Sequence, residues 1–173
     1  MTKFSKIREN NYAFIDSQNL NLGVKALGWS LDFKKFRIYL KEKYNVAQAY
    51  IFIGYMAGNQ SLYGSLQKYG YVLIFKPIII EEAGKPKGNI DADLVLQAMI
   101  DFYENHFDKA VIVTSDGDFY SLVDYFYQKN KLLAVLSPNK EKCSILLQKS
   151  AREKMMYVNN LRQKLEYKRK STA

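Results

Sequence analysis

The apolar positions of the chain follow two periods, and their alternation predicts the fold class. Short runs rich in β-branched and aromatic residues predict strands over 12–15, 49–53, 71–75, 110–114 and 132–136. Between these runs apolar residues recur at three- and four-residue spacing, which predicts helices over 32–44, 60–69, 90–105 and 119–129. The C-terminal part predicts a helix over 141–149, a short strand over 155–158 and a basic helix over 160–168.

Strands that are regularly separated by helices indicate a parallel sheet covered on both faces. We therefore expect an α/β fold, a three-layer α/β/α Rossmannoid with a mostly parallel central sheet. The segment 76–89 interrupts the rhythm with prolines and glycines around an apolar trio, which predicts a strand extension followed by a mobile loop. We expect one domain over 11–158, an N-terminal extension over 1–10 and a basic C-terminal helix or tail over 159–173.

Composition and charge exclude several classes of protein and of functional site. The chain has 173 residues, of which 48% are hydrophobic and 25% charged, and a net charge of +9 that favours a polyanionic partner. A single cysteine and a single histidine exclude an internal disulfide framework, a Cys-rich or multi-His zinc site, and any mechanism that needs two imidazoles. No apolar run approaches the roughly 20 residues of a membrane span, and the first ten residues lack the apolar core of a signal peptide. These features predict a soluble, cytoplasmic protein with no membrane partner, and they leave its oligomeric state open.

Aspartates fall where such a sheet places its functional crevice, at the carboxyl ends of the strands. Asp16 ends the first strand, Asp116 and Asp118 follow the strand over 110–114, and Asp91 and Asp93 open the helix over 90–105. Carboxylates that meet at one edge repel one another unless a cation lies between them. Oxygen ligands without Cys or His favour a hard cation, Mg²⁺ or Mn²⁺, which supports phosphodiester hydrolysis.

Each group of acids also has a purely structural interpretation. Asp16 suits a turn or a helix N-cap, and Asp116 and Asp118 suit the cap of the following helix. Asp91 and Asp93 suit the first turn of a helix, where the macrodipole favours acids. Because all three groups are expected at one edge of the sheet, their joint placement favours a functional site.

Three segments together resemble a known family. They are 14–19 (FIDSQN), 87–94 (KGNIDADL) and 113–119 (VTSDGDF). In order and spacing they resemble the NYN domain, closest to its LabA-like branch within the PIN-like nuclease superfamily. The resemblance covers about 11–158, and its last segment is the most specific. It implies a PIN-like sheet and a metal-dependent ribonuclease that hydrolyses RNA with a hydroxide generated at Mg²⁺ or Mn²⁺.

The resemblance also implies roles for four acids as catalytic and metal-binding residues. Asp16 matches the metal ligand after the first strand, and Asp91 matches the acid that opens the central helix. Asp116 and Asp118 match the pair that follows the strand over 110–114.

Further site candidates surround these acids. Asp93 is an additional metal candidate, although its position two residues after Asp91 turns it about 200° around a helix. Asn19 matches an asparagine that supports the first ligand or contacts substrate, and Ser115 stands where the family often has glycine. Lys85 and Lys87 precede the acids of the helix and are placed to reach a phosphate.

Two alternatives remain. A phosphatase similar to the haloacid dehalogenases needs a second aspartate two positions after the first, and here that position holds Gln18. A non-catalytic RNA- or protein-binding module on the same fold would retain the same acids, so the sequence leaves it open.

Overall fold

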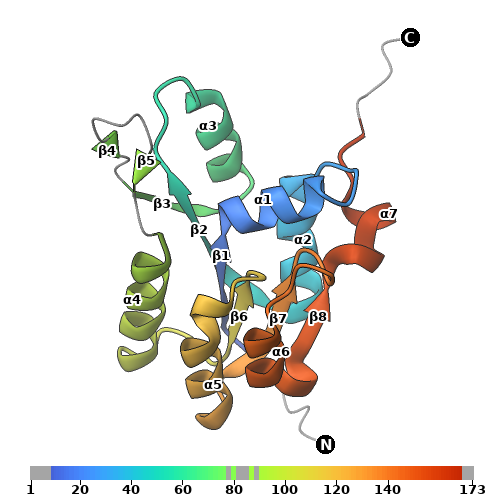
Figure 1. The fold of residues 1–173 in the computed structure, drawn as a ribbon. Coiled ribbons are helices and arrows are strands. Elements are labelled where there is room, and N and C mark those ends of the chain that lie inside the picture. The colour runs from blue at the N-terminus through green and yellow to red at the C-terminus, as the bar shows by residue number, and fades with distance from the viewer. Residues whose placement is uncertain (1–8, 77–78, 81–85, 88–89, 169–173) are drawn as a thin grey trace, which may run out of the picture.

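A six-stranded parallel sheet forms the centre of the fold (Figure 1). The computed structural model describes residues 9–76, 79–80, 86–87 and 90–168. The strand order is β3-β2-β1-β6-β7-β8. These strands are β1 (Asn11–Asp16), β2 (Val46–Gly54), β3 (Val72–Lys76), β6 (Ala110–Val113), β7 (Leu132–Ser137) and β8 (Met155–Tyr157). The three-layer α/β/α fold is thereby confirmed.

Helices cover both faces of the sheet. One face carries α1 (Ser17–Lys25), α2 (Phe33–Tyr44) and α3 (Gln60–Lys68). The other face carries α4 (Ile90–Tyr103), α5 (Tyr120–Gln128) and α6 (Ile145–Ala151). Shorter elements are the antiparallel pair β4 (Ile79–Ile80) and β5 (Pro86–Lys87), the 3-10 turns η1 (Gly117–Phe119), η2 (Arg152–Lys154) and η3 (Val158–Leu161), and α7 (Arg162–Leu165). None of the helices in the described residues is long and apolar enough to cross a bilayer.

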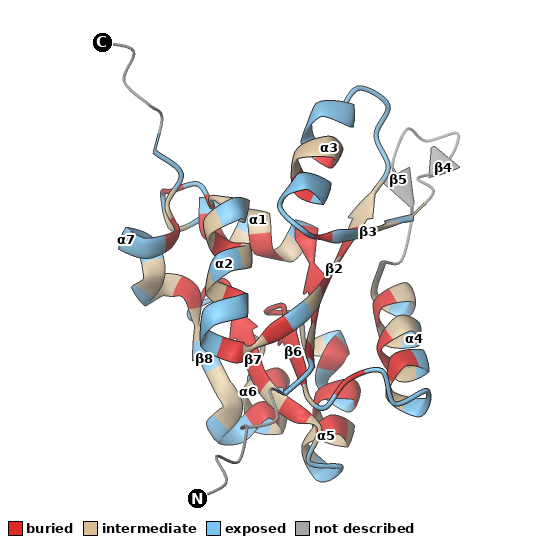
Figure 2. Ribbon diagram, turned by 180° about the vertical axis from the view of Figure 1, so that it is seen from behind, coloured by how far each residue is buried: buried red, intermediate tan, exposed pale blue. Residues whose placement is uncertain are grey.

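The core consists of two apolar layers separated by the sheet (Figure 2). All four residues of β6 are buried, as expected for a parallel strand covered on both faces. Successive strand residues face opposite layers, so Ile15 packs toward α1 and α2 while Phe14 packs toward α4 and α5. This alternation fixes which face the side chain at the end of each strand points to.

Helix α1 was not predicted from the sequence. Its Asn-rich segment has low helix propensity and its apolar stripe is short, so the pattern indicated no helix between Asp16 and Ser30. Burial of Leu20 and Val24, four residues apart, supplies the stabilisation that propensity lacks. Gly23 lets the helix approach the loop after β7, because a Cβ there would lie 2.8 Å from Pro138 Cβ.

The C-terminal part differs from its prediction at two helices. Helix α6 begins at Ile145 rather than at 141, and the basic helix expected over 160–168 is reduced to α7. The chain leaves the helical conformation because Glu166 pairs antiparallel with Leu31, and the Tyr167 amide donates to the Ser30 carbonyl at 2.8 Å. Within 76–89, Ile79–Ile80 of the expected strand extension form β4, which pairs with β5 in a separate two-stranded sheet; residues 77–78, 81–85 and 88–89 of the expected loop region lie outside the described residues.

Candidate active site at the carboxyl end of the sheet

The site lies where the strand order reverses. The chain passes from β1 to β2 on one side, and β6 is added to β1 on the other side. In an open parallel sheet this reversal leaves a crevice outside the carboxyl ends of the two strands. Asp16 ends β1, and the segment 114–118 directly follows β6, so both flank the crevice.

Asp16 is held in place by two hydrogen bonds. Its side chain caps α1 by accepting from the Asn19 backbone amide at 3.1 Å. The Thr114 hydroxyl donates to its second carboxylate oxygen at 3.4 Å. Only 6% of Asp16 is exposed, so the carboxyl group is buried and held in one orientation rather than solvated at the surface.

The turn after β6 presents two more carboxylates. Asp116 donates its backbone amide to the Thr114 hydroxyl at 3.1 Å, and its side chain accepts from the Asp118 amide at 2.9 Å. Gly117 allows this tight turn to pack against the start of α6, because a Cβ would lie 2.5 Å from Ser144 Oγ. Thr114 thus connects the acid of β1 with the acids after β6.

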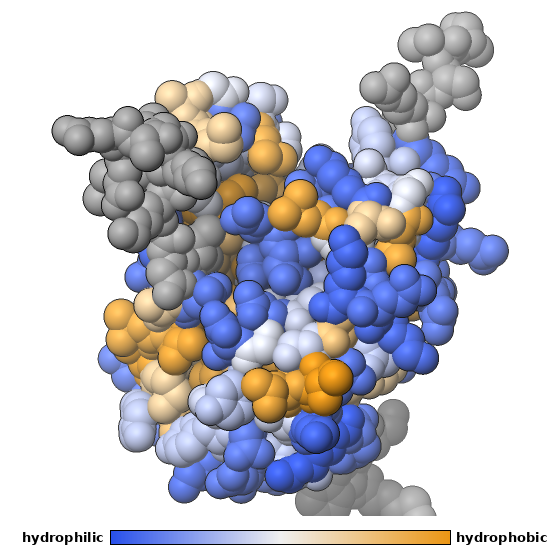
Figure 3. Space-filling model, viewed as in Figure 1, coloured by the Kyte–Doolittle hydropathy of each residue, from blue (hydrophilic) through white to orange (hydrophobic). Residues whose placement is uncertain are grey.

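Asp91 completes a cluster of three acids. It lies in the first turn of α4, and one carboxylate oxygen from each of Asp91, Asp116 and Asp118 lies within 4.8 Å of the others. Asp16 lies beside this set, and its charge interacts with those of Asp91 and Asp116. On the corresponding face of the molecule, hydrophilic side chains gather between α1, α4 and α5 (Figure 3). The structure therefore brings three of the four predicted acids together, with Asp16, the fourth, beside them.

The electrostatics of the cluster favour a bound cation. Burial raises the pKa of Asp16 to about 6, and the charges of Asp91 and Asp116 add to the increase against the hydrogen bonds from Asn19 and Thr114. Burial also raises the pKa of Asp91, and the charges of Asp116 and Asp118 raise it further. Carboxylates whose pKa values rise through mutual repulsion are suited to a divalent ion, because the ion removes the repulsion. Their oxygens are the ligands that Mg²⁺ and Mn²⁺ prefer.

Asp93, the additional metal candidate, lies outside the cluster of three, which agrees with its expected position about 200° around the helix from Asp91. Its carboxylate lies 3.9 Å from the Lys76 ammonium group, and its side chain is 46% exposed.

Sequence reasoning missed two residues of the site, Thr114 and Lys76. Lys76 ends β3 and opposes the increase in the pKa of Asp91, so it contributes positive charge beside the cluster. Both could have been found from the sequence, because each lies at the carboxyl end of a strand, where an open parallel sheet places its functional crevice.

Of the four predicted substrate-binding residues, the two whose side chains the structure describes make contacts within the protein. The Asn19 side-chain oxygen accepts from the Ser115 amide at 2.8 Å, which ties α1 to the turn after β6 and supports the position of Asp16. Ser115 is buried, and its hydroxyl lies 3.1 Å from that of Ser137, so its contacts are with the scaffold. Lys85 lies outside the described residues, and the structure describes Lys87 only as part of the backbone of β5.

Comparisons with known proteins agree with this architecture. A crystal structure of a protein of unknown function, VPA0982 from Vibrio parahaemolyticus, matches 91% of this chain and 96% of its own with a TM-score of 0.71. Their sequences are 22% identical, so this similarity shows the fold alone. A search of curated proteins gave no significant match. The sequence model of the NYN domain matches residues 12–158, which include every acid of the cluster. The chain therefore belongs to the NYN domain family, within the PIN-like nuclease superfamily.

Proposed function

We propose that this protein is a divalent-metal-dependent ribonuclease. The observation that carries the proposal is the meeting of Asp91, Asp116 and Asp118 within 4.8 Å at the carboxyl end of the sheet, beside the buried Asp16. Membership of the NYN family supports a nucleic acid as substrate. The net charge of +9 supports a polyanion held by basic surface around an acidic centre.

Each acid has a distinct task in this proposal. Asp91, Asp116 and Asp118 hold Mg²⁺ or Mn²⁺, which when bound activates water and neutralises charge on the phosphoryl oxygens. Asp16 orients one side of the centre through its two hydrogen bonds and adds negative charge. Thr114 is a positioning residue, because its hydroxyl contacts both Asp16 and the Asp116 amide.

The test compares two aspartates of the same helix. Asp91→Asn removes a carboxylate of the cluster. Asp93→Asn, two residues further along the helix, removes a carboxylate that pairs with Lys76 instead. Loss of groups that only orient a metal ligand already costs 10- to 100-fold, so Asp91→Asn should lower Mn²⁺-dependent cleavage of labelled RNA by about 100-fold or more. Asp93→Asn should retain most activity, and circular dichroism verifies that both variants fold.

Full activity of the Asp91→Asn protein would contradict the proposal. So would cleavage that continues in EDTA. RNA binding without cleavage under any divalent metal would instead favour a non-catalytic RNA-binding module on this fold.

A further inference from the structure

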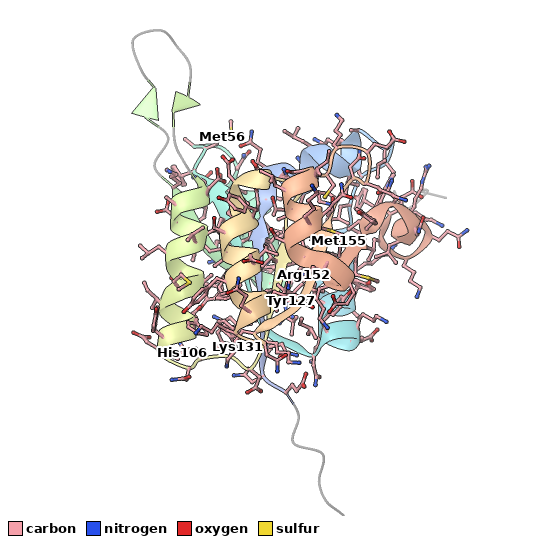
Figure 4. All side chains as sticks on the ribbon, turned by 60° about the horizontal axis from the view of Figure 1, so that its bottom comes forward. Met56, His106, Tyr127, Lys131, Arg152 and Met155 are labelled. Atoms are coloured by element: carbon pink, nitrogen blue, oxygen red, sulfur yellow. The ribbon has the colours of Figure 1, made fainter. Side chains whose placement is uncertain are left out.

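An aromatic surface lies at the carboxyl end of β2 and β3, beyond the acid cluster. Tyr55 is the first residue after β2, and its amide donates to the Lys76 carbonyl at the end of β3, at 3.1 Å. Asp16 pairs with Phe52 in the register of β1 and β2, so Tyr55 follows three residues later, about 10 Å further along the strand direction. Met56, the next residue, marks this loop in Figure 4, at the opposite end of the molecule from His106.

The rings of this surface are exposed on one side and fixed on the other. Tyr55 is 46% exposed and Phe75 is 41% exposed, whereas Tyr63 beneath them is 6% exposed. Tyr55 stacks on Tyr63 with ring centroids 6.0 Å apart, and Phe75 meets Tyr63 edge-on at 4.8 Å. The contact between Tyr55 and Phe75 is also edge-on, at 5.7 Å. Exposed rings that already rest on a buried ring lose little conformational entropy when a flat ligand covers them.

The loop that carries Tyr55 is also fastened. The Tyr63 hydroxyl accepts from the Met56 amide at 2.9 Å and lies within hydrogen-bonding distance of the Met56 carbonyl, at 3.3 Å. Because Tyr63 belongs to the buried side of α3, these bonds hold residues 54–56 in one position. The aromatic surface is therefore preorganised rather than a pair of freely rotating side chains.

Positive charge lies between this surface and the acids. The Lys76 ammonium group lies 3.9 Å from the Asp93 carboxylate, which places it beside the first turn of α4. A chain of nucleotides that crosses this edge of the sheet would meet carboxylates, an ammonium group and aromatic rings in turn. Single-stranded nucleic acids are recognised by this combination of backbone charge and base stacking.

We propose that Tyr55 and Phe75 form a base-stacking subsite for an unpaired nucleotide of the RNA, and that Lys76 faces the phosphate between this subsite and the acid cluster. This inference rests on the proposed function, because it takes the cluster as the place where the RNA backbone is cut. Tyr55 supplies the stacking face, Phe75 closes one side of it, and Tyr63 supports both from below.

The test measures binding of fluorescein-labelled oligoadenylate of about 15 nucleotides in EDTA by fluorescence anisotropy. Loss of one stacking ring should raise the Kd of Tyr55→Ala roughly tenfold, while Tyr55→Phe, which keeps the ring, should bind like the wild type. Tyr103→Ala is the matched control, because Tyr103 is 69% exposed and lies at the other end of α4. An abasic oligomer of the same length should bind equally to the wild type and to Tyr55→Ala, since it retains the phosphates and lacks the bases.

Three results would overturn the subsite. These are an unchanged Kd in Tyr55→Ala, an equal loss of affinity for the abasic oligomer, or no binding of oligoadenylate by the wild type. Cleavage of the same oligoadenylate in Mn²⁺ is measured separately. Weaker binding by Tyr55→Ala without any cleavage by the wild type would support the subsite and reject the nuclease. Cleavage by the wild type with unchanged binding by Tyr55→Ala would support the nuclease and reject the subsite.

Discussion

Replacement of Asp16 by Asn should stabilise the metal-free protein. Asp16 has an ordinary pKa of 3.8, and burial raises it to about 6 in the folded chain. Ionising this group therefore costs free energy in the folded state that it does not cost in the unfolded state. Each unit of difference between the folded and the ordinary pKa corresponds to about 1.4 kcal/mol, so the ionised Asp16 side chain destabilises the fold by about 3 kcal/mol at neutral pH. Asn keeps the helix cap, because Asn and Asp are equally good N-cap residues.

The direction of the pH dependence follows from the same values. Below the ordinary pKa of 3.8 the side chain is protonated in both states, and the wild type and the variant should be similarly stable. As the pH rises the unfolded chain releases its proton first, so the wild type loses stability until the pH passes about 6. Above that pH the advantage of Asp16→Asn should stay near its full value.

Urea denaturation at a series of pH values measures this effect. At neutral pH the variant should unfold at a higher urea concentration with an unchanged m-value, and its Tm should rise by roughly 6 to 12 °C. Added Mn²⁺ should narrow the difference, because binding to the folded state at about 100 times Kd stabilises the wild type by about 2.7 kcal/mol and the variant less. A variant that is less stable than the wild type at neutral pH without metal, or a stability difference that does not vary with pH, would refute the reasoning.

The remaining predictions concern packing and a second titrating group. Gly117→Ala should cost about 1 to 3 kcal/mol in urea denaturation, because its Cβ would lie 2.5 Å from Ser144 Oγ, and adding Ser144→Ala, which removes that oxygen, should recover part of the loss. Leu165→Ala should cost about 2 to 4 kcal/mol because this C-terminal side chain is buried in the core; equal stability would show that the residues after 158 are dispensable. The hydrogen bond to Asp101 raises the pKa of His106, so this contact should stabilise the fold at low pH and weaken as the pH rises through the raised value. The difference in Tm between the wild type and His106→Gln should therefore shrink between about pH 5.5 and about pH 8.5, and a constant difference would contradict it.

The spacing of apolar residues along the chain predicted the sheet and most of its helices. It does so because the side chains that a helix or strand buries recur with the period of that element. The all-buried run of β6 and the three- and four-residue spacing in α2 are visible in the sequence because both faces of the sheet are covered. Helix α1 was missed because its stability comes from Leu20 and Val24 meeting the core, which no local propensity records. The short α7 likewise depends on pairing of Glu166 with Leu31, far apart in the sequence.

For the candidate site, the sequence determined which acids stand at the ends of strands and at the start of a helix. The two-residue spacing already separated Asp93 from Asp91 around the helix, but the sequence could not determine that the acids meet, because that depends on the order of strands in the sheet. The tertiary structure placed Asp91 with Asp116 and Asp118, and it turned Asp93 toward Lys76. Only the tertiary structure buries Asp16 deeply enough to raise its pKa to about 6, since burial brings it beside groups such as Thr114 and Asp91 from distant parts of the chain.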